Sequence, residues 1–342
     1  MDEKRTRFWM VIINLQNYIM KDYIKLIRWP NLLFLGALNA LVYYMVVCPI
    51  LNMYSIKLDN ELWIFILLII SNIFIAAGGY VTNDYFDTKI DEINRPTKVI
   101  VGKTKTRKQV AVYFQILFGI GIIAGIILSI LLKDYTLAFV YITIPGLLWF
   151  YSSSYKRQFL IGNIVVGICT FLVIFIIGYA ANTALFNQYG ELIYQTNIIT
   201  EIYKWTASIG LFAFLLTLIR EIVKDMEDIE GDREMECRTM PIVWGINKSK
   251  IVVAVLSTIT LLIVAYFTFY KIPFENDPVS IKYFIFGIVL PFVVMFYLLG
   301  KAQSRRDFAQ ISLLLKYIMA VGSLYCVFIY YLILLNTTSI CS

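Results

Sequence analysis

Long apolar runs separated by shorter polar segments dominate this chain from residue 31 to residue 335. A helix that crosses the hydrocarbon core of a bilayer needs roughly 20 mostly apolar residues. By that measure we expect an all-α fold, a polytopic membrane protein with nine transmembrane helices. The predicted spans are 31–51, 61–82, 109–132, 135–151, 159–180, 205–223, 251–270, 281–300 and 313–335.

The pattern also predicts how the chain divides. Residues 31–342 are expected to form one membrane domain, because no polar stretch between the spans is long enough for a separate soluble domain. Residues 1–30 are expected to form an amphipathic segment that lies at the membrane interface. In the third span, Gly121 and Gly125 form a small-xxx-small pattern, which lets a neighbouring helix approach closely.

The composition supports a membrane protein and excludes some kinds of site. Hydrophobic residues make up 60% of the chain and charged residues only 15%, against roughly 45–50% and 25% in soluble domains. The chain has no histidine, and its five cysteines form no CxxC pair. A zinc site built from these residues and a histidine general base are therefore not expected.

The basic residues predict the orientation of the chain. Of its 30 lysines and arginines, 24 fall in the segments on the N-terminal side of the predicted membrane and five on the opposite side. Because cytoplasmic loops carry the excess of Lys and Arg, we expect a cytoplasmic N-terminus and an outside C-terminus in a prokaryotic plasma membrane. This distribution accounts for the net charge of +7 without a nucleic-acid partner.

In the first of two unusual cytoplasmic loops, roughly 83–108, acidic residues repeat at a helical spacing. The sequence NDYFDTKID places Asp84, Asp87 and Asp91 at positions i, i+3 and i+7, and Asn83 stands four residues before Asp87. If the second helix continues a turn or two beyond the membrane, these side chains share one face of it. A bound cation or a polycationic partner would remove the repulsion between them.

The second unusual loop, roughly 225–249, repeats this spacing with Asp225, Asp228 and Asp232. Carboxylate oxygens favour hard cations, and Mg²⁺ usually binds through a few carboxylates together with substrate phosphate oxygens. Two facing acidic ladders could therefore hold Mg²⁺ around a diphosphate. Ordinary solvated loop charges would explain one such ladder, but two of equal spacing on the same side favour a site.

These motifs carry a family resemblance. N-D-x-x-D-x-x-x-D after the second span and D-x-x-D-x-x-x-D after the sixth resemble the signatures of the UbiA superfamily of intramembrane prenyltransferases. Four further segments are similar to that family: R-W-P-N at 28–31, N-R-P at 94–96, Y-S-S-S-Y-K at 151–156 and G-N at 162–163.

The resemblance implies a bundle of nine helices around a central cavity, capped on the cytoplasmic side by the two acidic motifs. It also implies roles for particular residues. The expected metal ligands are Asn83, Asp87, Asp91, Asp225, Asp228 and Asp232. The expected catalytic residues are Asp87, Asp91, Asp228, Asp232 and Lys156. The expected substrate-binding residues are Arg28, Asn31, Asp84, Arg95, Tyr151, Asn163, Arg220 and Lys224. For Tyr151, a plain interfacial tyrosine at the end of a span is an equally good interpretation.

The implied activity is Mg²⁺-dependent transfer of a prenyl group, with geranylgeranyl the expected one, from a prenyl diphosphate donor to a membrane-associated acceptor. Around the second motif the sequence is most similar to the branch that makes digeranylgeranylglyceryl phosphate, so geranylgeranylglyceryl phosphate is the expected acceptor. An aromatic ring, as in quinone biosynthesis, stays an alternative, and the oligomeric state stays open. Outside this superfamily, a membrane transporter and a CDP-alcohol phosphotransferase are the other interpretations. The one-sided position of the carboxylates disfavours the transporter, and missing D-G and A-R elements disfavour the phosphotransferase.

Overall fold

A computed structural model describes the backbone of residues 20–97, 99–271 and 278–340. Nine helices in this part of the chain are long and apolar enough to cross a membrane, as expected from the sequence. The described residues form no strand, and their only β-type contact is an isolated bridge between Val101 and Lys105. The expected all-α fold is confirmed. The predicted interfacial segment lies mostly in residues 1–19, outside the described residues, while residues 20–26 are helical.

The nine spans are α2 (Trp29–Val42) with η1 (Tyr43–Val47) and α3 (Cys48–Met53), α4 (Glu61–Phe86), α6 (Arg107–Leu131), α7 (Tyr135–Ser153), α8 (Ile161–Tyr189) with η3 (Gly190–Gln195), α9 (Ile198–Glu227), α12 (Ile246–Tyr266) with η4 (Phe267–Lys271), α13 (Pro278–Tyr283) with η5 (Phe284–Val289) and α14 (Leu290–Lys301), and α15 (Arg305–Ile340). Four short helices lie between spans: α5 (Thr88–Asn94), η2 (Tyr155–Arg157), α10 (Ile229–Glu234) and α11 (Met240–Trp244).

Several helices extend beyond the apolar runs that predicted them. The polar stretch 181–203, between the fifth and sixth predicted spans, is largely helical, since α8 continues to Tyr189 and α9 begins at Ile198. The reason is that polarity marks the end of the hydrocarbon core, whereas a helix ends only where its backbone hydrogen bonds end.

Two spans contain a π-helical turn directly before a proline-containing helix. The turn η1 precedes α3, which has Pro49 in its first turn, and η5 precedes α14, which has Pro291 there. Proline lacks a backbone N–H and its ring clashes with the preceding turn, so the helix widens locally.

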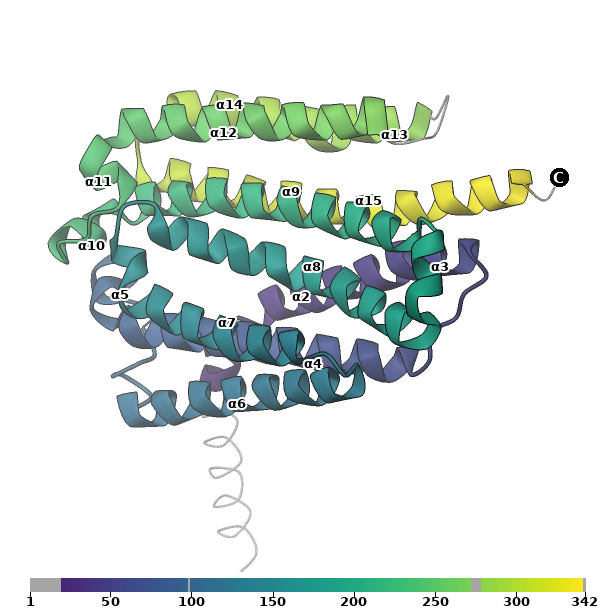
Figure 1. Cartoon of the computed structure of the whole chain (residues 1–342). Helices are drawn as coiled ribbons and strands as arrows, with labels where there is room; N and C mark the ends of the chain where they lie inside the picture. Colours follow the sequence, from purple (N-terminus) through teal and green to yellow (C-terminus); the bar gives the residue numbers. More distant parts are fainter. Residues whose placement is uncertain (1–19, 98, 272–277, 341–342) are drawn as a thin grey trace, which may run out of the picture.

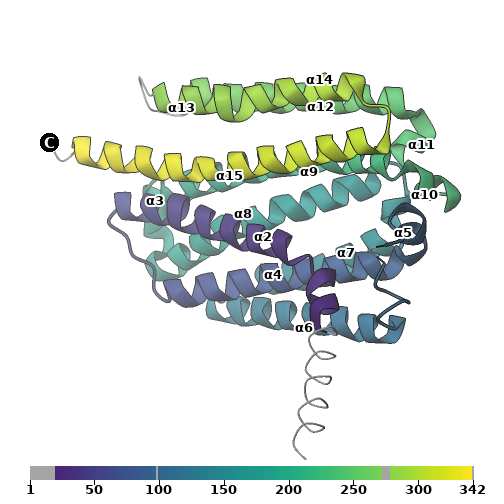
Figure 2. The same ribbon diagram turned by 180° about the vertical axis from the view of Figure 1, so that it is seen from behind.

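The long helices run side by side, and the short helices α5, α10 and α11 gather at one end of them (Figure 1). Helices α4 and α6 pack closely, as do α8 and α9. Helices α12, α13 and α14 form a layer along α9 and α15, which the view from behind also shows (Figure 2). Both acidic motifs therefore lie at the end that holds α5 and α10.

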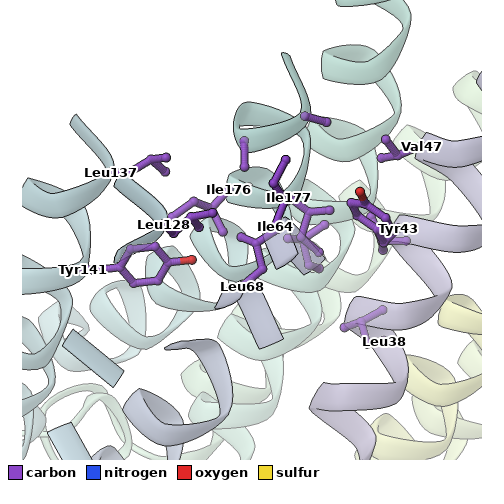
Figure 3. Close-up of a cluster of buried hydrophobic side chains, with 14 of the residues drawn as sticks. Leu38, Tyr43, Val47, Ile64, Leu68, Leu128, Leu137, Tyr141, Ile176 and Ile177 are labelled. Carbon is purple, nitrogen blue, oxygen red and sulfur yellow. The ribbon is translucent and has the colours of Figure 1, made fainter. Parts of the chain in front are cut away.

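A buried cluster joins the N-terminal half of the bundle (Figure 3). Leu68, Leu128 and Ile177 come from three different helices and are almost fully buried. A polar pair lies within it: the Asn72 side chain donates to Asn39 Oδ1 at 2.7 Å, and the Asn39 amide donates to the Leu35 carbonyl at 2.8 Å. In an apolar medium such groups must pair with each other, so this contact fixes α2 against α4.

The predicted small-residue face of the third span is a close helix contact. A Cβ atom on Gly121 would lie 2.7 Å from Ile75 Cγ1 and 3.2 Å from the Ser71 carbonyl oxygen. On Gly125 it would lie 2.4 Å from the ring of Tyr141. The two glycines thus let α6 approach α4 on one side and α7 on the other.

We expect Gly121→Ala to lower the stability of the protein by about 1–3 kcal/mol, because the added methyl group overpacks the α4–α6 contact. Thermal unfolding of the purified protein in detergent measures the change. Gly119→Ala is the matched control on the same helix, since no atom lies within 4 Å of its added Cβ. Equal unfolding temperatures for the two variants would show that the contact is not tight.

Candidate active site

Each acidic motif is bent at its central aspartate, which corrects the expectation of a single continuous helix face. Helix α4 ends at Phe86 and α5 begins at Thr88, so Asp87 lies between them, with φ −84° and ψ 2°. Asp228 occupies the same place between α9 and α10, with φ −100° and ψ 13°. The two motifs thus share a helix–aspartate–helix geometry that the spacing alone could not reveal.

Lys156 neutralises the first motif at Asp87. Its ammonium group forms an ion pair with the Asp87 carboxylate, which also accepts a hydrogen bond from Asn83 Nδ2 at 2.7 Å. Burial works against the charge of Lys156, but the Asp87 carboxylate, together with Tyr151 and Asp232, outweighs this effect and raises the pKa of the lysine. The segment that precedes the fifth span therefore supplies the counter-charge for the segment that follows the second.

The flanking Asp84 has its own basic partner. Arg28 Nη2 contacts Asp84 Oδ1 at 2.6 Å, and its guanidinium lies 5.2 Å from the centre of the Tyr80 ring. Asn31 is a near neighbour of Tyr80. Two residues expected to bind substrate, Arg28 and Asn31, thus lie beside the first motif.

Two arginines surround Asp228 in the second motif. Arg95 Nη2 lies 3.1 Å from Asp228 Oδ2, and Arg305 Nη2 lies 3.4 Å from Asp228 Oδ1. Asp225 instead accepts a hydrogen bond from Asn163 Nδ2 at 2.8 Å. The second motif is therefore held by residues from the first acidic loop, from α8 and from α15.

Asn94 joins the two acidic motifs directly. Its side chain is 5% exposed; it donates to the Asp228 carbonyl oxygen at 3.2 Å and accepts from the Gly231 N–H at 3.2 Å. A Cβ atom on Gly231 would lie 2.4 Å from the Asn94 amide nitrogen, so only glycine permits this approach. The side chain of Arg305 also donates to the Asn94 carbonyl oxygen.

Two further basic residues lie on α9, toward the membrane from Asp228. Glu221 Oε1 contacts Arg220 Nη1 at 3.1 Å, and Glu221 Oε2 contacts Lys224 Nζ at 3.1 Å. Tyr151 is an electrostatic neighbour of Glu221, Lys156 and Asp225. The structure thus brings the expected residues Tyr151, Arg220 and Lys224 to the same region as the two motifs.

The remaining aspartates carry charge that the protein does not fully balance. Burial raises the pKa of Asp91 to about 6, and the charges of Asp87 and Asp84 raise it further. Burial likewise raises the pKa of Asp232 to about 6, with Asp228 and Asp87 adding to the effect against the attraction of Lys156. A bound cation between the motifs would relieve this repulsion.

The chemistry of these donors fits Mg²⁺, because every expected ligand offers oxygen. Within the described residues, however, no three carboxylates converge to form a ready-made metal site. Asp87 and Asp228 are instead ion-paired with Lys156, Arg95 and Arg305. The expected assignment of metal ligands stays a prediction, and it requires that these basic groups share or release the carboxylates.

Two residues of the site were missed by the sequence analysis. Glu221 lies at the end of the sixth predicted span, directly before the second motif, and was assigned no role there, yet it binds both Arg220 and Lys224. Arg305 lies 77 residues after Asp228 and belongs to no motif. No local signal could have placed Arg305 at the site, because only the packing of α15 brings it there.

An apolar pocket lies elsewhere in the molecule, between α9, α12, η5 and α15. Its lining includes Trp205, Phe212, Ile288 and Gly322, and no residue of either acidic motif. The α9 residues that line it end at Leu215, well before Asp228. This pocket is therefore separate from the candidate active site.

We expect Asn94→Asp to destabilise the protein by about 1–3 kcal/mol, because a carboxylate cannot donate to the Asp228 carbonyl and is repelled by the motifs. Thermal unfolding with and without Mg²⁺ measures the effect. Asn247→Asp, at an exposed position near the same end, is the control. An unchanged unfolding temperature for Asn94→Asp would contradict the bridging role.

Comparison with known proteins identifies relatives over most of the chain. The profile of the UbiA prenyltransferase family matches residues 41–319. Digeranylgeranylglyceryl phosphate synthase of Methanosphaera stadtmanae is 32% identical over 306 residues, which cover 89% of this chain and 97% of the relative. The enzyme of the same name from Saccharolobus solfataricus is 34% identical over 248 residues, covering 71% of this chain and 76% of the relative.

Solved structures share the fold. A structure of digeranylgeranylglyceryl phosphate synthase covers 91% of this chain and 98% of its own at 22% identity, with a TM-score of 0.60. A UbiA homologue from Archaeoglobus fulgidus, bound to GPP and Mg²⁺, covers 90% of this chain and 99% of its own, at 14% identity and a TM-score of 0.54. The chain is an integral membrane protein that belongs to the UbiA prenyltransferase family.

Proposed function

We propose that this enzyme transfers a geranylgeranyl group from geranylgeranyl diphosphate to geranylgeranylglyceryl phosphate, in a Mg²⁺-dependent reaction. The observation that carries the proposal is the 32% identity to a relative named digeranylgeranylglyceryl phosphate synthase, over nearly the whole of both chains. The site supports it, because two acidic motifs meet at one end of an apolar helix bundle with three basic side chains at their centre.

Each acidic motif would hold Mg²⁺ together with the donor diphosphate. Asn83, Asp87 and Asp91 would supply the ligands on one side, and Asp228 and Asp232 those on the other, with Asp225 adjoining. Mg²⁺, when bound, would neutralise the diphosphate and make it a better leaving group. Asn94 would keep the two ligand sets at a constant separation, since it bonds to the backbone of both Asp228 and Gly231.

Basic side chains would bind the diphosphate as it leaves. Lys156 and Arg95 already contact the central aspartates, so a diphosphate between the motifs would lie within their reach. In the reaction the bond between the donor C1 carbon and the diphosphate oxygen breaks. The acceptor hydroxyl oxygen forms the new bond to C1 and loses its proton. Since the chain has no histidine, a carboxylate, the departing diphosphate or water accepts that proton.

The charge distribution supports a cytoplasmic N-terminus and an outside C-terminus in this proposal. The basic segments that predicted the orientation include the loops beside α5, α10 and α11, which lie together at one end of the bundle (Figure 1). The donor site would then face the cytoplasm.

We expect Asp87→Asn and Asp228→Asn each to lower the rate of prenyl transfer at least a hundredfold, because each removes a charged ligand at the centre of a motif. The assay uses purified protein in nanodiscs with Mg²⁺ and radiolabelled geranylgeranyl diphosphate. Asp59→Asn, an exposed substitution at the opposite end, should retain wild-type activity. Wild-type turnover by Asp87→Asn would contradict the assignment of the site.

The same assay tests the acceptor. We expect label to move to geranylgeranylglyceryl phosphate and not to 4-hydroxybenzoate or dihydroxynaphthoate. Transfer to an aromatic ring instead would keep the enzyme class and overturn the proposed acceptor. Absence of Mg²⁺-dependent transfer to any acceptor would contradict the proposed function as a whole.

A further inference from the structure

The proposed acceptor sets a requirement that the acidic motifs do not meet. It carries a phosphomonoester, and it must approach a donor that carries a diphosphate. Two anions held side by side repel each other strongly in a site of low dielectric constant. If the acidic motifs and Mg²⁺ hold the donor, the acceptor phosphate needs a separate group of positive charges nearby. This requirement rests on the proposed function.

Helix α15 presents a basic residue on the face that meets the site. Arg305, at the start of α15, contacts Asp228 and the Asn94 carbonyl. Lys316 lies eleven residues later, and eleven residues make about three turns, so both side chains leave the helix in nearly the same direction. The rise of 1.5 Å per residue places Lys316 about 16 Å further into the membrane.

Helix α9 presents two basic residues at a matching depth. Lys224 and Arg220 stand four and eight residues before Asp228, which corresponds to about 6 and 12 Å along the helix. Helix α15 packs against both α9 and α2. The charge of Lys316 interacts with those of Arg220, Lys224, Arg28 and Arg95. Arg95 is paired with Asp228, which leaves Lys316 and the other three as four cations in one region.

The carboxylates in this region do not balance the four cations. Asp84 pairs with Arg28, and the single carboxylate of Glu221 serves both Arg220 and Lys224. Asp225 turns to Asn163 instead. Lys316 thus adds a like charge to a region where the carboxylates of Asp84 and Glu221 are already shared among Arg28, Arg220 and Lys224. Uncompensated charge at membrane depth is costly.

One buried hydrogen-bond donor in this region also lacks a hydrogen-bond acceptor. The Nε atom of Arg220 is buried and has no hydrogen-bond partner among the described residues. Snorkelling to the interface explains many lysines near helix ends, but Lys316 lies about three turns inside α15. Its side chain is exposed, so its ammonium group is accessible to a ligand. Ionisable residues at membrane depth are costly, so both features point to an anionic ligand.

We propose that Arg220 and Lys316, with Lys224 between them and the acidic motifs, form a second anion site that binds the phosphomonoester of the acceptor lipid. The acceptor hydroxyl and its phosphate are on adjacent carbons of the glycerol, so the two anion sites must lie within about one to two helical turns of each other. Lys224 and Arg220 lie about one and two turns from Asp228 and meet that condition, while Lys316, about three turns from Arg305, would close the far side of the site. The phosphomonoester is a dianion when fully ionised. Its charge matches the region, where the four cations outnumber the paired carboxylates of Asp84 and Glu221 by two.

The test uses Lys316→Gln, Lys316→Arg and the control Arg306→Gln, an exposed position on the same helix. The full chain in nanodiscs is assayed with each substrate varied in turn. We expect Lys316→Gln to raise the KM for geranylgeranylglyceryl phosphate tenfold or more and to change the KM for geranylgeranyl diphosphate less than twofold. Lys316→Arg should restore the acceptor KM, and Arg306→Gln should match the wild type.

A second readout does not depend on turnover. Without donor and without Mg²⁺, geranylgeranylglyceryl phosphate should raise the unfolding temperature of the wild type and of Arg306→Gln, but not that of Lys316→Gln. Geranylgeranylglycerol, which lacks the phosphate, should give no such difference. Inorganic phosphate at the same concentration should give little stabilisation, because the site is expected to bind the headgroup of a lipid.

The outcomes separate the two proposals. If the wild type transfers label to geranylgeranylglyceryl phosphate but Lys316→Gln keeps its acceptor KM within twofold, the second anion site is overturned and the function stands. If donor and acceptor KM rise equally, Lys316 serves the donor or the fold, and the inference is also overturned. If the wild type transfers no label to this acceptor, the proposed function itself fails.

Discussion

The short contact between the two acidic loops is the constraint on which the site depends. Each loop follows a different membrane-spanning helix, and like charges on the two loops repel each other. Asn94 offsets that repulsion with two neutral hydrogen bonds to the backbone of the second loop, at Asp228 and Gly231. Gly231 permits the approach because a side chain there would collide with the Asn94 amide. The separation of the two carboxylate sets is therefore defined by backbone geometry, which a bound ion need not create.

Around this contact, each central aspartate is matched with a basic side chain from a distant segment. Lys156 reaches Asp87 from the segment directly before the fifth span. Arg95 reaches Asp228 from the loop after the second span, and Arg305 reaches it from the start of the ninth span. Buried carboxylates without such partners would be protonated or would destabilise the fold. The same cations are suited to a diphosphate, so the groups that stabilise the protein alone can also bind its substrate.

The membrane as solvent made the fold unusually predictable. Nine apolar runs indicated nine spans because hydrocarbon accepts only helices that satisfy their own backbone groups, or closed barrels. The errors lie at polar helix ends, such as the part of α8 that continues to Tyr189. The residues of the site were predictable where they repeat at a regular spacing, as in the two acidic motifs. They were not predictable where, as with Glu221, one acidic residue looks like any other charge.

The sequence by itself determined the fold class, the number of spans and the two acidic motifs, because hydrophobicity and periodicity are local properties of the chain. The tertiary structure alone decided which charges meet. Arg305 and Lys316 belong to no motif and lie far along the chain from Asp228 and Arg220, yet the packing of α15 against α9 brings each pair into one region. The tertiary structure also placed the helix breaks at Asp87 and Asp228. A helix ends where its backbone hydrogen bonds end, and the regular spacing of the aspartates does not mark that point.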